Sequence, residues 1–108
     1  MSAVLPKLID LQGLKVEKLT GAGPGAATSI ANGAAGNITI TITSPGWVID
    51  VAGIPSITGI PAGLVLAGFT YSVSPNSITI TVTLYNPTAA AISVGANAIS
   101  VIVFAVIR

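Results

Sequence analysis

Residues 77–86, SITITVTLYN, alternate apolar and polar side chains without interruption, and the rest of the chain is best understood around them. The apolar positions are Ile78, Ile80, Val82 and Leu84, and the polar positions are Thr79, Thr81, Thr83 and Tyr85. A period of two is typical of a β-strand with one covered face and one solvated face. These residues therefore predict a strand whose Ile/Val side faces a core.

The same pattern recurs in residues 37–43, NITITIT, and three further apolar runs predict strands at residues 47–51, 64–73 and 99–107. The turn signal at Ser74, Pro75 and Asn76 predicts an antiparallel hairpin with a loop of about three residues. Gly68 predicts a bulge in the strand before that turn. Six or so short strands without a convincing helix indicate an all-β fold, an antiparallel β-sandwich of jelly-roll or Ig-like type with an N-terminal arm.

The chain divides into three segments by composition. Residues 1–20 hold five of the seven charged side chains, and they are either a first edge strand or an arm that docks on a neighbouring protein. Residues 21–36 are rich in glycine and alanine and predict a linker or loop. Residues 37–108 then form the sandwich body, with a Pro-rich crossover at 54–63 and a small-residue loop at 87–98.

Composition limits the classes of partner. The 108 residues suffice for one domain, 52% are hydrophobic and only 6% are charged, and the net charge is +1. Neither nucleic acid nor an anionic membrane surface is expected to bind so weakly charged a chain. Residues 89–107 are uncharged, but their Ser, Gly, Asn and β-branched residues favour a loop and a strand over a membrane-spanning helix.

Catalytic chemistry is not expected. The chain has no histidine and no cysteine, and its three carboxylates, Asp10, Glu17 and Asp50, are not predicted to converge. We expect no catalytic residue, no metal site and no cofactor, and therefore no enzyme. Asp50 either pairs with Arg108 or a lysine of a neighbouring subunit, or is an exposed strand residue.

The aromatic side chains leave two alternatives open. They are expected either to pack in a core or interface, or to form a patch that binds carbohydrate. The residues concerned are Trp47, Phe69, Tyr71, Tyr85 and Phe104.

Self-association is expected from the strands themselves. Ile/Thr strands with few charges aggregate through bare edges unless an assembly closes them, which predicts a symmetric homo-oligomer, a trimer. Residues 99–107 are apolar on both faces, so this strand is either central in the sandwich or lies in a subunit interface. The interface candidates are Leu8, Ile9, Leu11, Leu14, Val16, Ile102, Phe104 and Val106.

Three stretches carry a resemblance to a known class of protein. Residues 45–51 (PGWVIDV), 60–64 (IPAGL) and 72–93 (SVSPNSITITVTLYNPTAAAIS) are similar to β-sandwich modules of tailed-bacteriophage virion proteins. The shared features are a Pro-Gly turn into a strand, a Pro-x-Gly-Leu approach to a strand, and an alternating strand closed by Asn-x-Thr. The resemblance covers about residues 45–105 and implies a trimeric sandwich on a virion.

Within that class, a short, charge-poor chain with a distinct N-terminal segment resembles a capsid decoration (cement) protein. The resemblance implies a non-enzymatic protein that stabilises the phage head, located on the capsid surface and assembled in the host cytoplasm. Its partners would be copies of itself and the major capsid protein or another virion protein, with residues 1–20 as the anchor. The alternative is a short fibre or adhesin-like sandwich that binds a host surface glycan.

Overall fold

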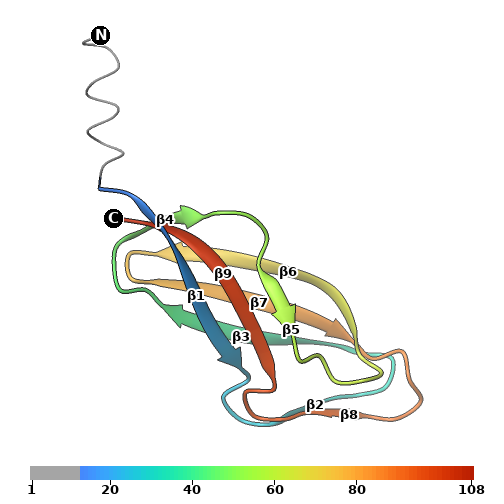
Figure 1. Ribbon diagram of the computed structural model, residues 1–108. Coiled ribbons are helices and arrows are strands. Elements are labelled where there is room, and N and C mark those ends of the chain that lie inside the picture. Colours follow the sequence, from blue (N-terminus) through green and yellow to red (C-terminus); the bar gives the residue numbers. More distant parts are fainter. Residues whose placement is uncertain (1–12) are drawn as a thin grey trace.

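The protein folds as an antiparallel β-sandwich, as the alternating strands predict (Figure 1). The structure, a computed structural model, describes residues 13–108, and no helix occurs among them. The strands are β1 (Lys15–Gly23), β2 (Thr28–Ile30), β3 (Ala35–Thr43), β4 (Val48–Val51), β5 (Ser56–Thr58), β6 (Val65–Ser74), β7 (Ser77–Tyr85), β8 (Ile92–Val94) and β9 (Ile99–Ile107).

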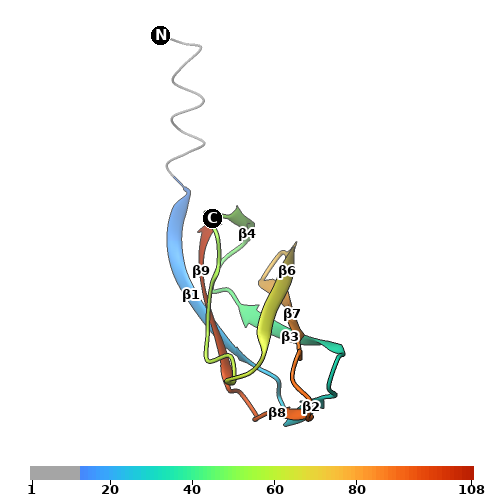
Figure 2. The same cartoon turned by 90° about the vertical axis from the view of Figure 1, so that its right-hand side faces the viewer.

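Two sheets form the layers. The first, called here sheet I, has the order β1-β9-β4, and β5 also pairs with β9; the second, sheet II, has the order β3-β7-β6. Figure 2 shows the two sheets facing each other, with the small β2–β8 ribbon beyond one end of both. The central strands are therefore β9 and β7.

The two alternating Ile/Thr strands are direct neighbours. Ile40 of β3 pairs with Ile80 of β7, and Thr41 pairs with Thr79, so like residues lie side by side. Because alternate residues of a strand point to opposite faces, one face of sheet II is entirely aliphatic along these strands and the other is hydroxylated. The predicted strand at 77–86 is thus the centre of its sheet.

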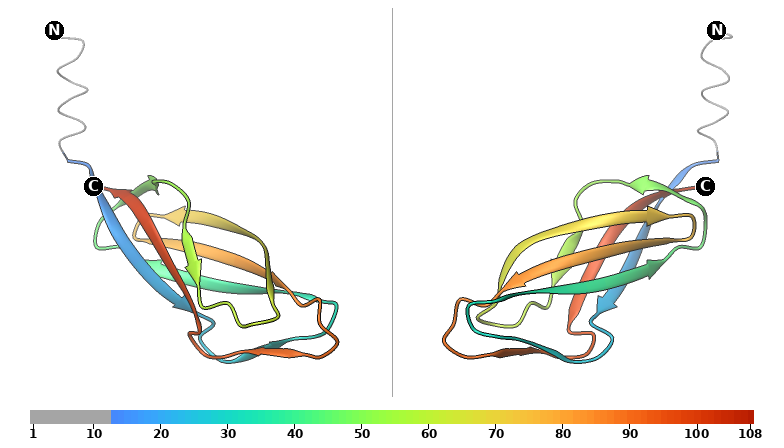
Figure 3. Two further views of the ribbon diagram at one scale, coloured as in Figure 1. Left: turned by 45° about the vertical axis from the view of Figure 1, so that its right-hand side comes forward. Right: turned by 180° about the vertical axis from the view of Figure 1, so that it is seen from behind.

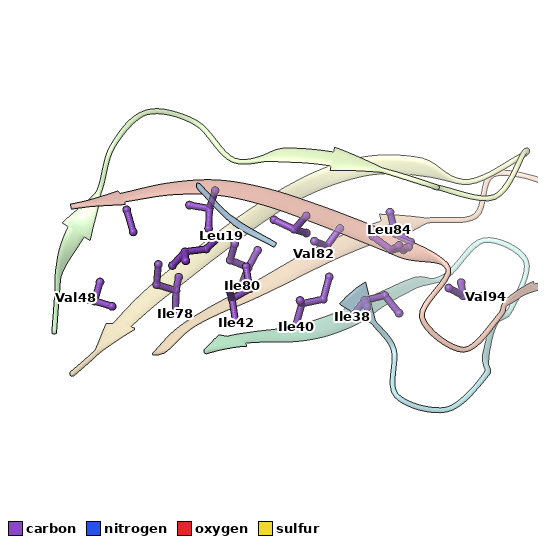
Figure 4. Close-up of a cluster of buried hydrophobic side chains, with 14 of the residues drawn as sticks. Leu19, Ile38, Ile40, Ile42, Val48, Ile78, Ile80, Val82, Leu84 and Val94 are labelled. Atoms are coloured by element: carbon purple, nitrogen blue, oxygen red, sulfur yellow. The ribbon is translucent and has the colours of Figure 1, made fainter. Parts of the chain in front are cut away.

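The aliphatic face of β7 forms the middle of the core, where Ile78, Ile80, Val82 and Leu84 are fully buried. Figure 4 shows these side chains between the ribbons of the two sheets. From sheet I, alternate residues of β9 meet them. Those buried β9 residues are Ile99, Val101, Val103, Ala105 and Ile107.

The β6–β7 hairpin confirms the predicted bulge and corrects the length of the loop. The register shifts between Leu66 and Gly68, where the bulge was predicted. Ser74 pairs with Ser77, so only Pro75 and Asn76 form the loop, and Ser74 is a strand residue.

The predicted boundary between linker and body needs correction. Within residues 21–36, the first three complete β1, Thr28–Ile30 is β2, and the last two begin β3. Strand β1 pairs with β9 from Lys15 to Gly23, so residues 15–20 belong to an edge strand of the body. The part of the predicted arm at residues 1–12 lies outside the described residues.

Glycine is needed in β1 because this strand passes close to β3. A Cβ added at Gly21 would lie 2.6 Å from Cγ1 of Ile42, and one at Gly23 would lie 2.8 Å from Cγ1 of Ile40. At Gly21 and Gly23, the glycine that predicts a linker therefore reflects tight packing between the two sheets. Strands β5 and β8 also lie in segments predicted as a crossover and a loop. The sequence does not predict them as strands, because three residues are too few to show alternation.

Candidate assembly surface

Strand β9 has the central position that was one of the two alternatives raised by its two apolar faces; its place in a subunit interface stays a prediction. It is central in sheet I, with β1 on one side and β4 and β5 on the other. Its remaining face, carrying Ile102, Phe104 and Val106, points away from the core, and Phe104 is 47% exposed. An apolar row therefore remains on the outside of the sandwich.

Strand β1 extends this row with Val16, which pairs with Val106 and is 61% exposed. We call Val16, Ile102, Phe104 and Val106 the outer patch. Lys18 and Thr20 border it on β1, where they pair with Phe104 and Ile102. Asp50 and Ser56 border it on the other side, where they pair with Val106 and Ile102.

The structure thus brings together four of the eight predicted interface residues. Leu14 immediately precedes β1 and is half-buried. Leu8, Ile9 and Leu11 lie outside the described residues, so their assignment stays a prediction.

The outside of sheet II has the opposite character. Thr41, Thr79 and Ser72 form one row across its three strands, and Thr39, Thr81 and Thr70 form the next. The hydroxyl of Thr83 donates to Oδ1 of Asn37 at 2.8 Å. Such a face is hydrated by hydroxyls without charge, whereas the outer patch offers water only carbon atoms. The two outer faces of the sandwich are therefore chemically different.

Asp50 lies on β4 and is exposed, as one of its two predicted alternatives states. Its Oδ1 accepts a hydrogen bond of 2.7 Å from the backbone N–H of Val51. The carboxylate borders the outer patch without entering a pocket.

The exposed aromatic side chains are spread over the molecule. Trp47 lies just before β4, where Val48 donates its N–H to the carbonyl of Pro75. Tyr85 is the last residue of β7. The first residue of β7, Ser77, lies beside Pro75 at the other end of the strand, eight residue steps or about 27 Å away. Tyr71 belongs to β6, between these ends. These rings do not form one stacking platform.

Sequence patterns alone missed several exposed apolar residues, among them Ile54, Val65 and Leu66. Ile54 follows Gly53, which has a φ of 87°, and precedes Pro55, so it lies in a bend outside the strands. The only available signal was a large apolar residue next to turn residues.

Residues 13–108 contain no group of three or more side chains that could hold a metal ion, and no cavity occurs among them. None of these residues belongs to a helix long and apolar enough to cross a membrane.

Comparisons with models of protein families, with curated proteins and with solved structures find no match in any of the three.

Proposed function

We propose that this chain is a non-enzymatic structural protein of a virion, a capsid decoration protein that acts as a symmetric homo-oligomer. The supporting observation is the outer patch, an apolar row on a molecule whose opposite face is covered with hydroxyls. With only 6% charged residues, the chain has few charges that could prevent nonspecific association through this row. A partner surface that covers the row removes this liability.

Copies of the same chain are the proposed cover, and a trimer is the proposed number. Burying a Val, Ile or Phe side chain stabilises an interface by about 1.5–3 kcal/mol, so four residues from each subunit supply a substantial apolar contact. The weak charge removes one source of repulsion between identical subunits. The proposed location is the capsid surface, after assembly in the host cytoplasm.

Changing Phe104 to lysine tests this contact. We expect Phe104→Lys to weaken self-association by about 100-fold or more, because about 3 kcal/mol of apolar burial is replaced by a charge that the interface leaves unpaired. The wild-type mass in sedimentation or light scattering should be a multiple of three times the chain mass of 10.6 kDa. The variant's mass should be about a third of it.

The matched control is Thr41→Lys, which adds the same charge to the exposed outer face of sheet II. This control should keep the wild-type mass, and circular dichroism should show strands in both variants. A wild-type chain that is monomeric at micromolar concentration would contradict the proposal, as would a Phe104→Lys variant of unchanged mass.

The attachment to the capsid is proposed to reside in residues 1–12, with the major capsid protein or another virion protein as partner. Removing residues 2–12 leaves β1 complete, whereas a deletion through residue 20 would remove buried Leu19 and break the β1–β9 pairing. The shortened chain should fold and self-associate but no longer bind capsids of the parent phage in co-sedimentation. A chain with these residues shuffled is the control for composition, and undiminished binding of the deletion would refute the anchor.

The second candidate is a short fibre or adhesin-like sandwich that binds a host surface glycan. The exposure of Trp47, Tyr71 and Tyr85 favours it, since exposed aromatic rings can stack on sugars. Their separation disfavours a single extended site. A glycan array would decide: binding that is lost in Trp47→Ala or Tyr85→Ala would support this candidate over the first.

A further inference from the structure

The side of the sandwich formed by β6 is open. Ile40 of β3, Ile80 of β7 and Tyr71 of β6 form one row on the core side of sheet II. Ile40 is 1% exposed and Ile80 is fully buried, but Tyr71 is 46% exposed. The core cover that sheet I provides is therefore incomplete at β6: Val73 still packs against the core, but Tyr71 is left half-exposed.

The cause lies in the strands opposite. Sheet I faces this side with β4 and β5, which have four and three residues, whereas β6 has ten. Figure 3 shows β6 as one border of sheet II and β3 as the other. The β3 border is closed by β1, whose glycines lie against Ile40 and Ile42. Among residues 13–108, the β6 border is contacted from sheet I mainly by the short strand β4 and has no cover of the length of β1.

The backbone of β6 is also unpaired on its outer side. In a hairpin with a two-residue loop the closing pair, here Ser74 and Ser77, is hydrogen-bonded. Alternate residues then direct their N–H and C=O groups away from β7, namely Phe69, Tyr71 and Val73. Among the described residues no other strand pairs with β6. Three donors and three acceptors are thus available along one edge.

This edge lacks the usual protection against strand pairing. Residues 65–74, VLAGFTYSVS, contain no charge and no proline. Edge strand β1, by contrast, carries Lys18 and an exposed ion pair between Lys15 and Glu17 at 3.3 Å. Charged side chains on an edge prevent pairing with other chains, so β1 is protected and β6 is not.

We propose that β6 pairs antiparallel with β6 of a second copy, about a two-fold axis at Tyr71, and joins the two sheets II into one six-stranded sheet. This axis uses the whole regular part of the strand after the bulge, residues 68–74. Phe69 then faces Val73 of the second copy on the core side, and Thr70 faces Ser72 on the hydroxyl side. Each outward N–H meets an outward C=O, and the half-covered aromatic side chains cover one another.

A second copy is the fitting occupant because β6 has the required pattern itself. The added strand must be apolar on the core side and hydroxylated on the other, and it must bring no charge against an uncharged edge. Residues 69–74, FTYSVS, satisfy each condition. The contact is separate from the outer patch and does not depend on the proposed function; with both contacts, two trimers joined in this way give six copies.

Disulfide trapping tests the pairing and its register, and the chain has no cysteine of its own. Thr70→Cys, with a tag that changes its size, is co-expressed with untagged Ser72→Cys. Facing residues in such a non-hydrogen-bonded pair have Cα atoms about 4.5 Å apart, within the range of a disulfide. We expect the mixed disulfide to exceed, about tenfold, that of a Thr39→Cys and Thr41→Cys pair on edge β3. An equal yield from the two edges would overturn the proposal.

A charge on the edge provides the second measurement. Tyr71→Lys should halve the mass of the assembly and leave the fold intact, because an edge lysine cannot be buried against its own copy. An unchanged mass would overturn the proposal. The outer patch is tested independently, since Phe104→Lys should leave the Thr70–Ser72 disulfide in place.

Discussion

Asn86→Asp should lower the free energy of unfolding by about 3–5 kcal/mol, a large part of the stability of a small domain. Asn86 is fully buried at the end of β7. Its Nδ2 donates to the carbonyl oxygens of Ile30 and Ala90, both at 2.8 Å. Its Oδ1 accepts from the N–H and the hydroxyl of Thr88. Aspartate has the same shape but no donor, so it would direct a buried negative charge at two carbonyl oxygens.

Asn37→Asp is the matched control for this substitution. Asn37 is exposed and its Oδ1 accepts from the Thr83 hydroxyl, a bond that a carboxylate keeps. Its unfolding free energy should change by less than about 0.5 kcal/mol. Urea unfolding followed by circular dichroism compares the two. The loss in Asn86→Asp should shrink at acidic pH, where a neutral carboxyl supplies one donor; equal stability of the two variants would show that the amide donors of Asn86 are not needed.

The role of Asn86 illustrates how far the sequence predicts this fold. Asn-Pro-Thr after an alternating strand predicts a local hydrogen bond between Thr88 and Asn86, and in the structure the N–H of Thr88 donates to Oδ1 of Asn86. It does not predict the bond to Ile30, which lies in a segment interpreted as a linker. The central strands β3 and β7 are predictable because their alternation is complete. The β2–β8 ribbon is not predictable, since it depends on the buried side chain of Asn86, which is distant from β2 in the sequence.

For the surfaces, too, the sequence predicts local features but not the contacts between distant segments. Apolar residues on both faces of β9 predict a central strand or an interface, but only pairing with β1 shows that Val16 extends the row formed by Phe104 and its neighbours. The open side at β6 could not be predicted. Phe69, Tyr71 and Val73 alternate like core residues, and their exposure results from the shortness of the strands opposite. Periodicity reports which face a residue shares, and the extent of the facing sheet decides whether that face is covered.

The closed side at β1 gives the second large effect, because its packing leaves no room for side chains. An ideal Cβ at Gly23 would lie 2.8 Å from Cγ1 of Ile40 and 3.2 Å from the carbonyl oxygen of Thr39. Ile40 is a buried core residue and cannot move into solvent. We expect Gly23→Ala to reduce the free energy of unfolding by about 1–3 kcal/mol, and Gly23→Val by more, because each forces β1 away from β3.

Gly68→Ala is the control that separates crowding from the general effect of removing a glycine. Gly68 also lies in a strand, but nothing lies within 4 Å of the position its Cβ would take. Alanine there should leave stability unchanged or raise it by about 0.4–1 kcal/mol, since it restricts the unfolded chain. Thermal unfolding of the three variants should therefore show a loss of stability at Gly23 and no loss at Gly68. A Gly23→Ala variant as stable as Gly68→Ala would mean that β1 and β3 can separate at little cost, and that the glycines of β1 reflect a flexible joint after all.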